Sequence, residues 1–238
     1  MNFYDFHIHS SFSEGESTVE EIAQRAKFLG FKGICFVQYF KDRSQISHLK
    51  EKISKISKET NLEIFIGLEA KNPEELNRLI DMRRDYDILL VQGSDIDLNR
   101  KAVQAKEVDI LTHPEFNRKD HGFNHVMARL SSSNKVAIEI NFREILLSSK
   151  NRRSMIMHNI SENVKLCKKF RVPIIICSGA VSYWQLKDPK ILLSMGCILG
   201  LDLNEAKKAL SETPEKIIKM IKERHDSKWI RPGVKVIE

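Results

Sequence analysis

The chain has 238 residues, of which 42% are hydrophobic and 30% are charged, a balance typical of a globular protein with an ordinary core. Lysine and arginine number 39 against 32 for aspartate and glutamate, giving a net charge of +7, which favours a polyanionic partner without requiring one. The sequence shows no stretch apolar enough to span a bilayer and no signal peptide. We therefore expect a cytoplasmic protein.

The cysteines contribute little to a functional hypothesis. Cys35, Cys167, Cys177 and Cys197 form no Cys-x-x-Cys pair, which argues against a zinc knuckle or a thiol redox motif. Cys35 and Cys177 lie inside apolar runs and are expected to be buried thiols in a reducing compartment.

The first recognisable element is a short strand at residues 4–10. Side chains alternate between the two faces of a strand, so Asp5, His7 and His9 are expected on one face, with Tyr4, Phe6 and Ile8 on the other. Two imidazoles one residue apart, with a carboxylate behind them, can begin a divalent-metal site. The alternative is that both histidines are ordinary surface or core residues.

Strand and helix patterns then alternate to the end of the chain. Further strands are predicted at 33–37, 63–69, 87–91, 108–111, 136–140 and 173–177. Helices are predicted from a capping box at 17–20, over 44–58, from 72, over 97–106, 125–130 and 151–170, and from 188, 202 and 213. The tail from about residue 226 has no periodicity and is predicted to be irregular.

Alternating strands and helices without a linker indicate parallel β-α units in one domain over residues 1–238. A closed barrel and an open doubly wound sheet both fit this order. Because no Gly-x-Gly-x-x-Gly follows the first strand, the dinucleotide-binding open sheet is disfavoured. We predict an α/β fold, a TIM-barrel-like barrel of about seven mostly parallel strands surrounded by helices.

In such a barrel the functional residues lie at the carboxyl ends of the strands. His7, His9, Glu69 and His113 all occupy predicted strand ends, and histidines and a carboxylate from separate strands can hold a water-activating metal. Strands also end in polar residues simply because the chain reaches solvent, so this pattern alone leaves both interpretations open. Gln38, Tyr39, Glu139, Asn141 and Ser178 end other strands.

The motifs at these ends resemble the polymerase-and-histidinol-phosphatase (PHP) superfamily of metal-dependent phosphoesterases. The resemblance lies in Asp5-x-His7-x-His9-Ser10, Gly67-x-Glu69 and Thr112-His113-Pro114. Where that superfamily usually has Asp-His after the second strand, this chain has Gln38-Tyr39, and where it has Ser-Asp-x-His late in the chain, this one has Ser178-Gly179-Ala180-Val181. The resemblance thus implies a dismantled multinuclear site, with one residual divalent metal on His7, His9, Glu69 and His113.

The departures resemble one branch of that superfamily, the ribonuclease P protein component 3 family, over nearly the whole chain. The segments that carry this resemblance are 4–7, 99–103, 108–114, 117–120 with 125–126, 178–180 with 184–187, and 204–207. It implies a subunit that binds the catalytic RNA and assists removal of the 5′ leader from precursor tRNA. The RNA would perform the cleavage with Mg²⁺, and the chain itself would need no cofactor and contribute no catalytic residue.

The same resemblance implies ribonuclease P RNA, precursor tRNA, a small RRM-like subunit and other ribonuclease P proteins as partners. Basic side chains in or near the family-like segments are the expected RNA contacts, since double-stranded RNA is bound largely through its phosphates and shape: Arg100, Arg118, His125, Lys169, Lys187 and Lys207. Lys169 also fits a helix C-terminus on electrostatic grounds alone. Arg143, Arg152 and Arg153 are second choices.

Two other functions stay open at this level. A stand-alone metal-dependent phosphoesterase is supported by the remaining histidines and opposed by the missing ligands. A protein-interaction scaffold without RNA binding is opposed by the basic charge. The helix with Met155, Met157 and Ile160 is a candidate partner surface, although methionines in such a row usually belong to the core.

Overall fold

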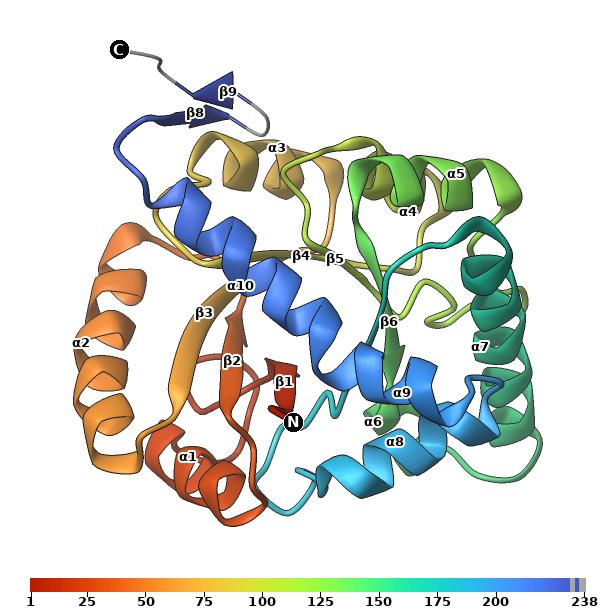
Figure 1. Ribbon diagram of the computed structural model, residues 1–238, viewed down its shortest axis with the longest axis horizontal. Helices are drawn as coiled ribbons and strands as arrows, with labels where there is room; N and C mark the ends of the chain where they lie inside the picture. The colour runs from red at the N-terminus through yellow and green to blue at the C-terminus, as the bar shows by residue number, and fades with distance from the viewer. Residues whose placement is uncertain (232–233, 236–238) are drawn as a thin grey trace.

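The computed structural model describes residues 1–231 and 234–235. Seven parallel strands, adjacent in chain order, curl into a nearly closed barrel with helices on its outside (Figure 1). The strands are β1 (Tyr4–Ile8), β2 (Gly33–Gln38), β3 (Glu63–Ala70), β4 (Ile88–Gln92), β5 (Ile110–Thr112), β6 (Ala137–Asn141) and β7 (Ile174–Cys177). The predicted TIM-barrel-like class is confirmed.

The helices follow the strands in turn, mostly behind a recognisable cap. They are α1 (Val19–Phe28), α2 (Arg43–Thr60), α3 (Pro73–Asp81), α4 (Ile96–Gln104), α5 (His125–Asn134), α6 (Phe142–Leu147), α7 (Lys150–Phe170), α8 (Pro189–Ile198), α9 (Leu203–Leu210) and α10 (Glu212–Arg224). The first capping box joins Thr18 to Glu21, one residue later than predicted. Asn72, Asp188 and Asp202 cap α3, α8 and α9 with side-chain oxygens.

Two apolar layers hold the barrel together. The outer layer lies between the strands and the surrounding helices and includes Ile34, Phe36 and Leu68. The inner layer fills the barrel with alternate residues of the same strands, such as Cys35 and Val37. Ile217, Ile218 and Ile221 of α10 join this inner layer, and Figure 1 shows α10 running across the barrel. The last helix therefore closes the end of the barrel opposite the predicted site.

The first strand contains an irregularity that the alternation rule does not predict. Asp5 pairs with Ile34 but Ile8 pairs with Phe36, so the register shifts by one residue between them. As a result Tyr4 and Phe6 join the inner layer, whereas Ile8 joins the outer layer. The prediction that Tyr4, Phe6 and Ile8 share one face is wrong, because a bulge reverses the alternation partway along the strand.

The barrel is closed between β1 and β7 by few contacts. Ile8 forms an isolated parallel bridge with Ala180, and the His9 amide donates to the Ala180 carbonyl at 2.8 Å. One carboxylate oxygen of the buried Asp5 accepts the Ser178 amide at 3.1 Å. Asp5 thus acts as a structural link across the seam.

The C-terminal segment differs from the irregular tail predicted from about residue 226. Strands β8 (Trp229–Arg231) and β9 (Val234–Lys235) pair antiparallel, and the Arg84 guanidinium lies 5.2 Å from the centre of the Trp229 ring. Residues 232–233 and 236–238 of the predicted tail lie outside the described residues.

A buried charge cluster attaches α10 to the barrel. Asp109 is 2% exposed and bonds Arg83 directly, while Arg224 of α10 reaches its Oδ1 at 3.0 Å. The Asp109 carboxylate also accepts the Leu89 amide at 2.9 Å. One carboxylate therefore compensates two buried guanidinium groups and joins β4, β5 and α10.

Replacing Asp109 by Asn should destabilise the protein strongly. The substitution keeps the shape but leaves two buried guanidinium groups without a compensating charge, which costs about 3–5 kcal/mol of unfolding free energy. Urea unfolding measures the loss, with Asp81→Asn at the exposed end of α3 as the matched control. A loss for Asp109→Asn no larger than that of the control would contradict this role.

Candidate functional site

The carboxyl end of the barrel opens into a polar cavity of about 300 Å³. Its lining includes His7 and His9 from the end of β1, Glu69 from β3 and His113 after β5. The four predicted metal ligands are thus brought to one mouth, although sequence separates the first from the last by more than 100 residues.

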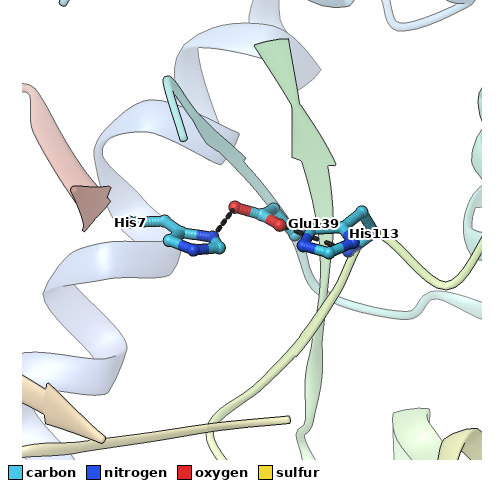
Figure 2. A group of neighbouring side chains, drawn as sticks. All are labelled: His7, His113 and Glu139. Carbon is cyan, nitrogen blue, oxygen red and sulfur yellow. Dashed lines mark hydrogen bonds and ion pairs between the residues drawn. The ribbon is translucent and has the colours of Figure 1, made fainter. Parts of the chain in front are cut away.

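His7 is the centre of this group. Its Nδ1 lies 2.7 Å from the Glu139 carboxylate, and its Nε2 lies 3.1 Å from Nε2 of His9. Figure 2 shows His7 directed at Glu139 with His113 on the other side of that carboxylate. His9 directs its Nδ1 at the Val37 carbonyl at 3.1 Å, so its Nδ1 carries the hydrogen and its Nε2 offers a lone pair to His7.

These contacts separate the pKa values of the three histidines. Burial opposes protonation of His7, but the Glu139 carboxylate overcomes it and raises the pKa of His7 to about 9. Burial and the charge on His7 lower the pKa of His9, and burial lowers the pKa of His113 to about 4. Near neutral pH, His7 is therefore an imidazolium that donates hydrogen bonds to Glu139 and to His9. His9 is neutral because its pKa is lowered, so its 3.7 Å contact with Glu14 is not an ion pair.

The donor set forms two overlapping groups. His7, His9 and Glu69 place one ligand atom each within 4.8 Å of one another, and so do His7, His113 and Glu139. The predicted four residues therefore do not form one ligand cluster, and Glu139 is an additional member. The sequence places Glu139 near the end of a predicted strand, but because every residue of β6 is buried, no local pattern shows that Glu139 faces His7.

The rim of the cavity carries charges of both signs. Glu14 accepts from Arg143 at 3.1 Å and from the Tyr39 hydroxyl at 3.3 Å. Lys71 lies over the Tyr39 ring, 3.2 Å from its centre. Tyr39 therefore takes part in a rim network.

Packing explains why a glycine occupies position 179, in the segment after β7. Gly179 has φ of +62°, and a Cβ there would lie 2.5 Å from the Asn141 side chain. A larger side chain, such as the Asp expected of a complete metal site, would require Asn141 to move. The backbone at this position is fitted to a residue without a side chain.

The predicted RNA-binding residues are spread over one side of the barrel. Arg100 lies on α4, His125 on α5, Lys169 on α7 and Lys207 on α9, and Lys187 lies in the loop after β7. Helix α5 contacts both α4 and α7, and Lys168 of α7 pairs with Glu205 of α9 at 2.7 Å. These helices follow one another around the barrel in Figure 1, so four of the six residues lie on one continuous flank.

Arg118 is engaged within the protein. Its guanidinium makes a bidentate contact with Asp120, at 2.7 and 2.8 Å, and donates to the Ser94 carbonyl at 2.8 Å. The guanidinium thereby stabilises the loop between β5 and α5. Three of its five hydrogens are committed, which leaves two for an outside partner.

The family model described as RNase P subunit p30 matches residues 2–226. The chain belongs to this family. It is 35% identical to ribonuclease P protein component 3 of Methanosarcina mazei, over 99% of this chain and 96% of the relative, and 33% identical to that of Methanococcus maripaludis, over 92% and 94%. The family predicted from the sequence motifs is confirmed.

Solved structures agree with this assignment. A chain in a cryo-EM structure of archaeal ribonuclease P with mature tRNA superposes with a TM-score of 0.83 at 31% identity, covering 98% of both chains. A Xaa-Pro dipeptidase superposes with a TM-score of 0.60 at 10% identity, covering 93% of this chain and 76% of the other, which indicates a shared fold alone. Within the described residues, no helix has the length and hydropathy needed to cross a membrane.

The His7–Glu139 pair predicts a pH-dependent stability. Because the pKa of His7 is about 9 in the folded state and about 6.5 in an unfolded chain, the pair stabilises fully below pH 6.5 and its contribution disappears as pH rises through 9. The total change amounts to about 3 kcal/mol. Glu139→Gln should remove this alkaline decline, measured by urea unfolding from pH 6 to 10. Glu74→Gln on the surface of α3 is the control, and an equal alkaline decline in both variants would refute the pairing.

Proposed function

We infer that this chain is a protein subunit of ribonuclease P that binds RNA and assists removal of the 5′ leader from precursor tRNA. The observation that supports this most directly is the 98% mutual coverage with a chain of archaeal ribonuclease P. The superposition has a TM-score of 0.83 at 31% identity, and the family model described as RNase P subunit p30 supports the same role.

The chain acts as a platform rather than as the catalyst. Its mouth presents a protonated His7 held by Glu139. The end of β2 and the loop after β7 offer Gln38, Tyr39 and Gly179 where a multinuclear hydrolytic site needs further ligands. Cleavage is then the task of the RNA subunit with Mg²⁺. The stand-alone phosphoesterase is the less favoured function.

The flank formed by α4, α5, α7 and α9 is the proposed RNA-binding face. Arg100, His125 and Lys169 are exposed there and Lys207 is partly exposed. Cations along successive helices can follow a phosphate backbone and release its counterions. Lys187 and the two free hydrogens of Arg118 would extend the face towards the mouth of the barrel.

The partners within the particle are proposed to be the RNA subunit, precursor tRNA, a small RRM-like subunit and other ribonuclease P proteins. The sequence resemblance supports this set, and the exposed apolar residues Ile191, Ile198 and Leu203 on α8 and α9 offer area for a protein contact. A cytoplasmic location is proposed as well, and the four free cysteines fit a reducing compartment.

The mouth can also hold one divalent metal ion, as a second and separate proposal. His113 Nδ1 and Glu69 Oε2 are buried and lack a hydrogen-bond partner among the described residues, and imidazole with carboxylate suits zinc or manganese. His7, His9 and Glu69, or His7, His113 and Glu139, would hold the ion, which could polarise a bound water. His7 would have to lose the proton it shares with His9.

If the RNA-binding face is correct, removing cations from it should lower RNA affinity more than removing cations from α2. Arg100→Ala/Lys169→Ala should weaken binding of the ribonuclease P RNA and lower the salt dependence by about two counterions. Filter binding across a salt series and reconstituted precursor-tRNA cleavage at moderate Mg²⁺ are the measurements. Lys55→Ala/Lys58→Ala on α2 removes the same charge elsewhere. Equal effects of the two double variants would contradict the proposed RNA-binding face. Full precursor-tRNA cleavage without this chain would contradict the proposed role in ribonuclease P.

The metal proposal has its own test. Titration calorimetry of the purified chain with Zn²⁺ or Mn²⁺ should show one site whose affinity rises up to about pH 9, because the ion must displace a proton from His7. His7→Ala should abolish binding, since His7 belongs to both ligand groups. His48→Ala on the exposed face of α2 should leave it unchanged. Binding that survives His7→Ala would exclude this site.

A further inference from the structure

A second cavity of about 240 Å³ lies beside the mouth. It opens between the β5–α5 loop and the first half of α7. Its walls include the apolar side chains of Phe116, Met155 and Ile156. The charged lining residues are three cations and two carboxyl groups: Arg118, Lys119, Arg152, Glu115 and Glu144. Ligand pockets commonly begin near 300 Å³, so this volume suits one flat ring system rather than a larger molecule.

The cavity contains a buried carboxyl group that its surroundings only half satisfy. Glu115 lines the cavity and is 4% exposed. Its Oε2 accepts from the Asn163 amide at 3.3 Å, whereas its Oε1 has no hydrogen-bond partner within residues 1–231 and 234–235. A buried polar atom without a partner costs free energy. A ligand with a polar edge would provide the missing hydrogen bond.

Three buried asparagines fix the loop that forms one wall. Asn99 of α4 donates to the carbonyls of Pro114 and Gly122 at 3.1 and 2.8 Å. Asn159 and Asn163 of α7 donate to the carbonyls of Asp120 and His121 at 3.1 and 2.8 Å. The loop is therefore held from both sides, and binding in the cavity would require little additional ordering of it.

The cations at the cavity indicate the chemical class of the ligand. Arg118 is compensated by Asp120. Lys119 and Arg152 are exposed, and neither forms a salt bridge with another described residue. Glu144 offsets part of the charge of Arg152, and the cations still outnumber the carboxyl groups by three to two. An apolar slot with a hydrogen-bonding group inside and exposed cations beside it matches a nucleotide, in which a flat polar-edged base is flanked by phosphates.

We propose that this cavity receives one unpaired nucleobase of the RNA, stacked against Phe116 and Met155 with its edge at Glu115. The proposal rests on the RNA-binding function and adds a contact that reads more than phosphate charge. Lys119 and Arg152 contact the phosphates on either side of the inserted base. The cavity would thus anchor the RNA at one nucleotide next to the flank of α4, α5 and α7.

The test uses a substitution that should weaken binding of a base in the cavity but should not weaken binding of phosphates. Met155 is 40% exposed, so Met155→Arg fits the helix surface, blocks the cavity and adds a positive charge. Fluorescence anisotropy of the full chain compares a labelled short oligoadenylate with an abasic ribose-phosphate oligomer of the same length. Phe28→Arg at the end of α1, a site 78% exposed, adds the same charge elsewhere.

The wild-type chain should bind the oligoadenylate about tenfold more tightly than the abasic oligomer, as expected for one stacked base. Met155→Arg should remove that preference without weakening binding of the abasic oligomer, and Phe28→Arg should keep the preference. Equal binding of both oligomers by the wild type would overturn the base pocket while leaving the RNA-binding function intact, and would assign the cavity to a protein side chain. Absence of salt-dependent binding to either oligomer would overturn both.

Discussion

The closure of seven strands into a barrel depends on a narrow seam between β1 and β7. One isolated bridge, the His9 amide and the buried Asp5 carboxylate join the two strands. The seam also determines the site, because the bulge that lets β1 meet this edge turns both Phe6 and His7 towards the interior. Asp5 therefore has a structural role, although its spacing from His7 and His9 suggests a metal site at first sight.

At the mouth, protonated His7 places a hydrogen between its own Nε2 and Nε2 of His9. A metal ion could otherwise bridge these two nitrogen atoms. The imidazolium of His7 satisfies Glu139 on one side and His9 on the other, so the buried carboxylate is compensated without a metal. Such a pair keeps the barrel stable as a scaffold. It also shows how a mouth lined with histidines and glutamates can balance its own charges.

Much of this architecture could be predicted from the sequence, because apolar runs and helix caps are local signals. The strands, the order of the units and the convergence of His7, Glu69 and His113 all follow from such signals. The bulge in β1 depends on pairing with β2 and β7, which no local pattern records. Helix α6 is six residues long, too short for a periodic signal. Glu139 lies on a strand whose two faces are both buried, so only the closed barrel shows that it faces His7.

The β5–α5 loop connects the mouth of the barrel with the proposed RNA-binding flank. Pro114 and Gly122 mark its ends, and both carbonyls are bound by the same Asn99 amide on α4, a helix of the proposed RNA-binding flank. Movement of this loop would disturb His113 at the mouth, the cavity lined by Glu115 and the position of His125 on α5. A rigid loop allows a basic flank to present its cations at fixed spacing, and shape recognition of folded RNA requires fixed spacing more than it requires many charges.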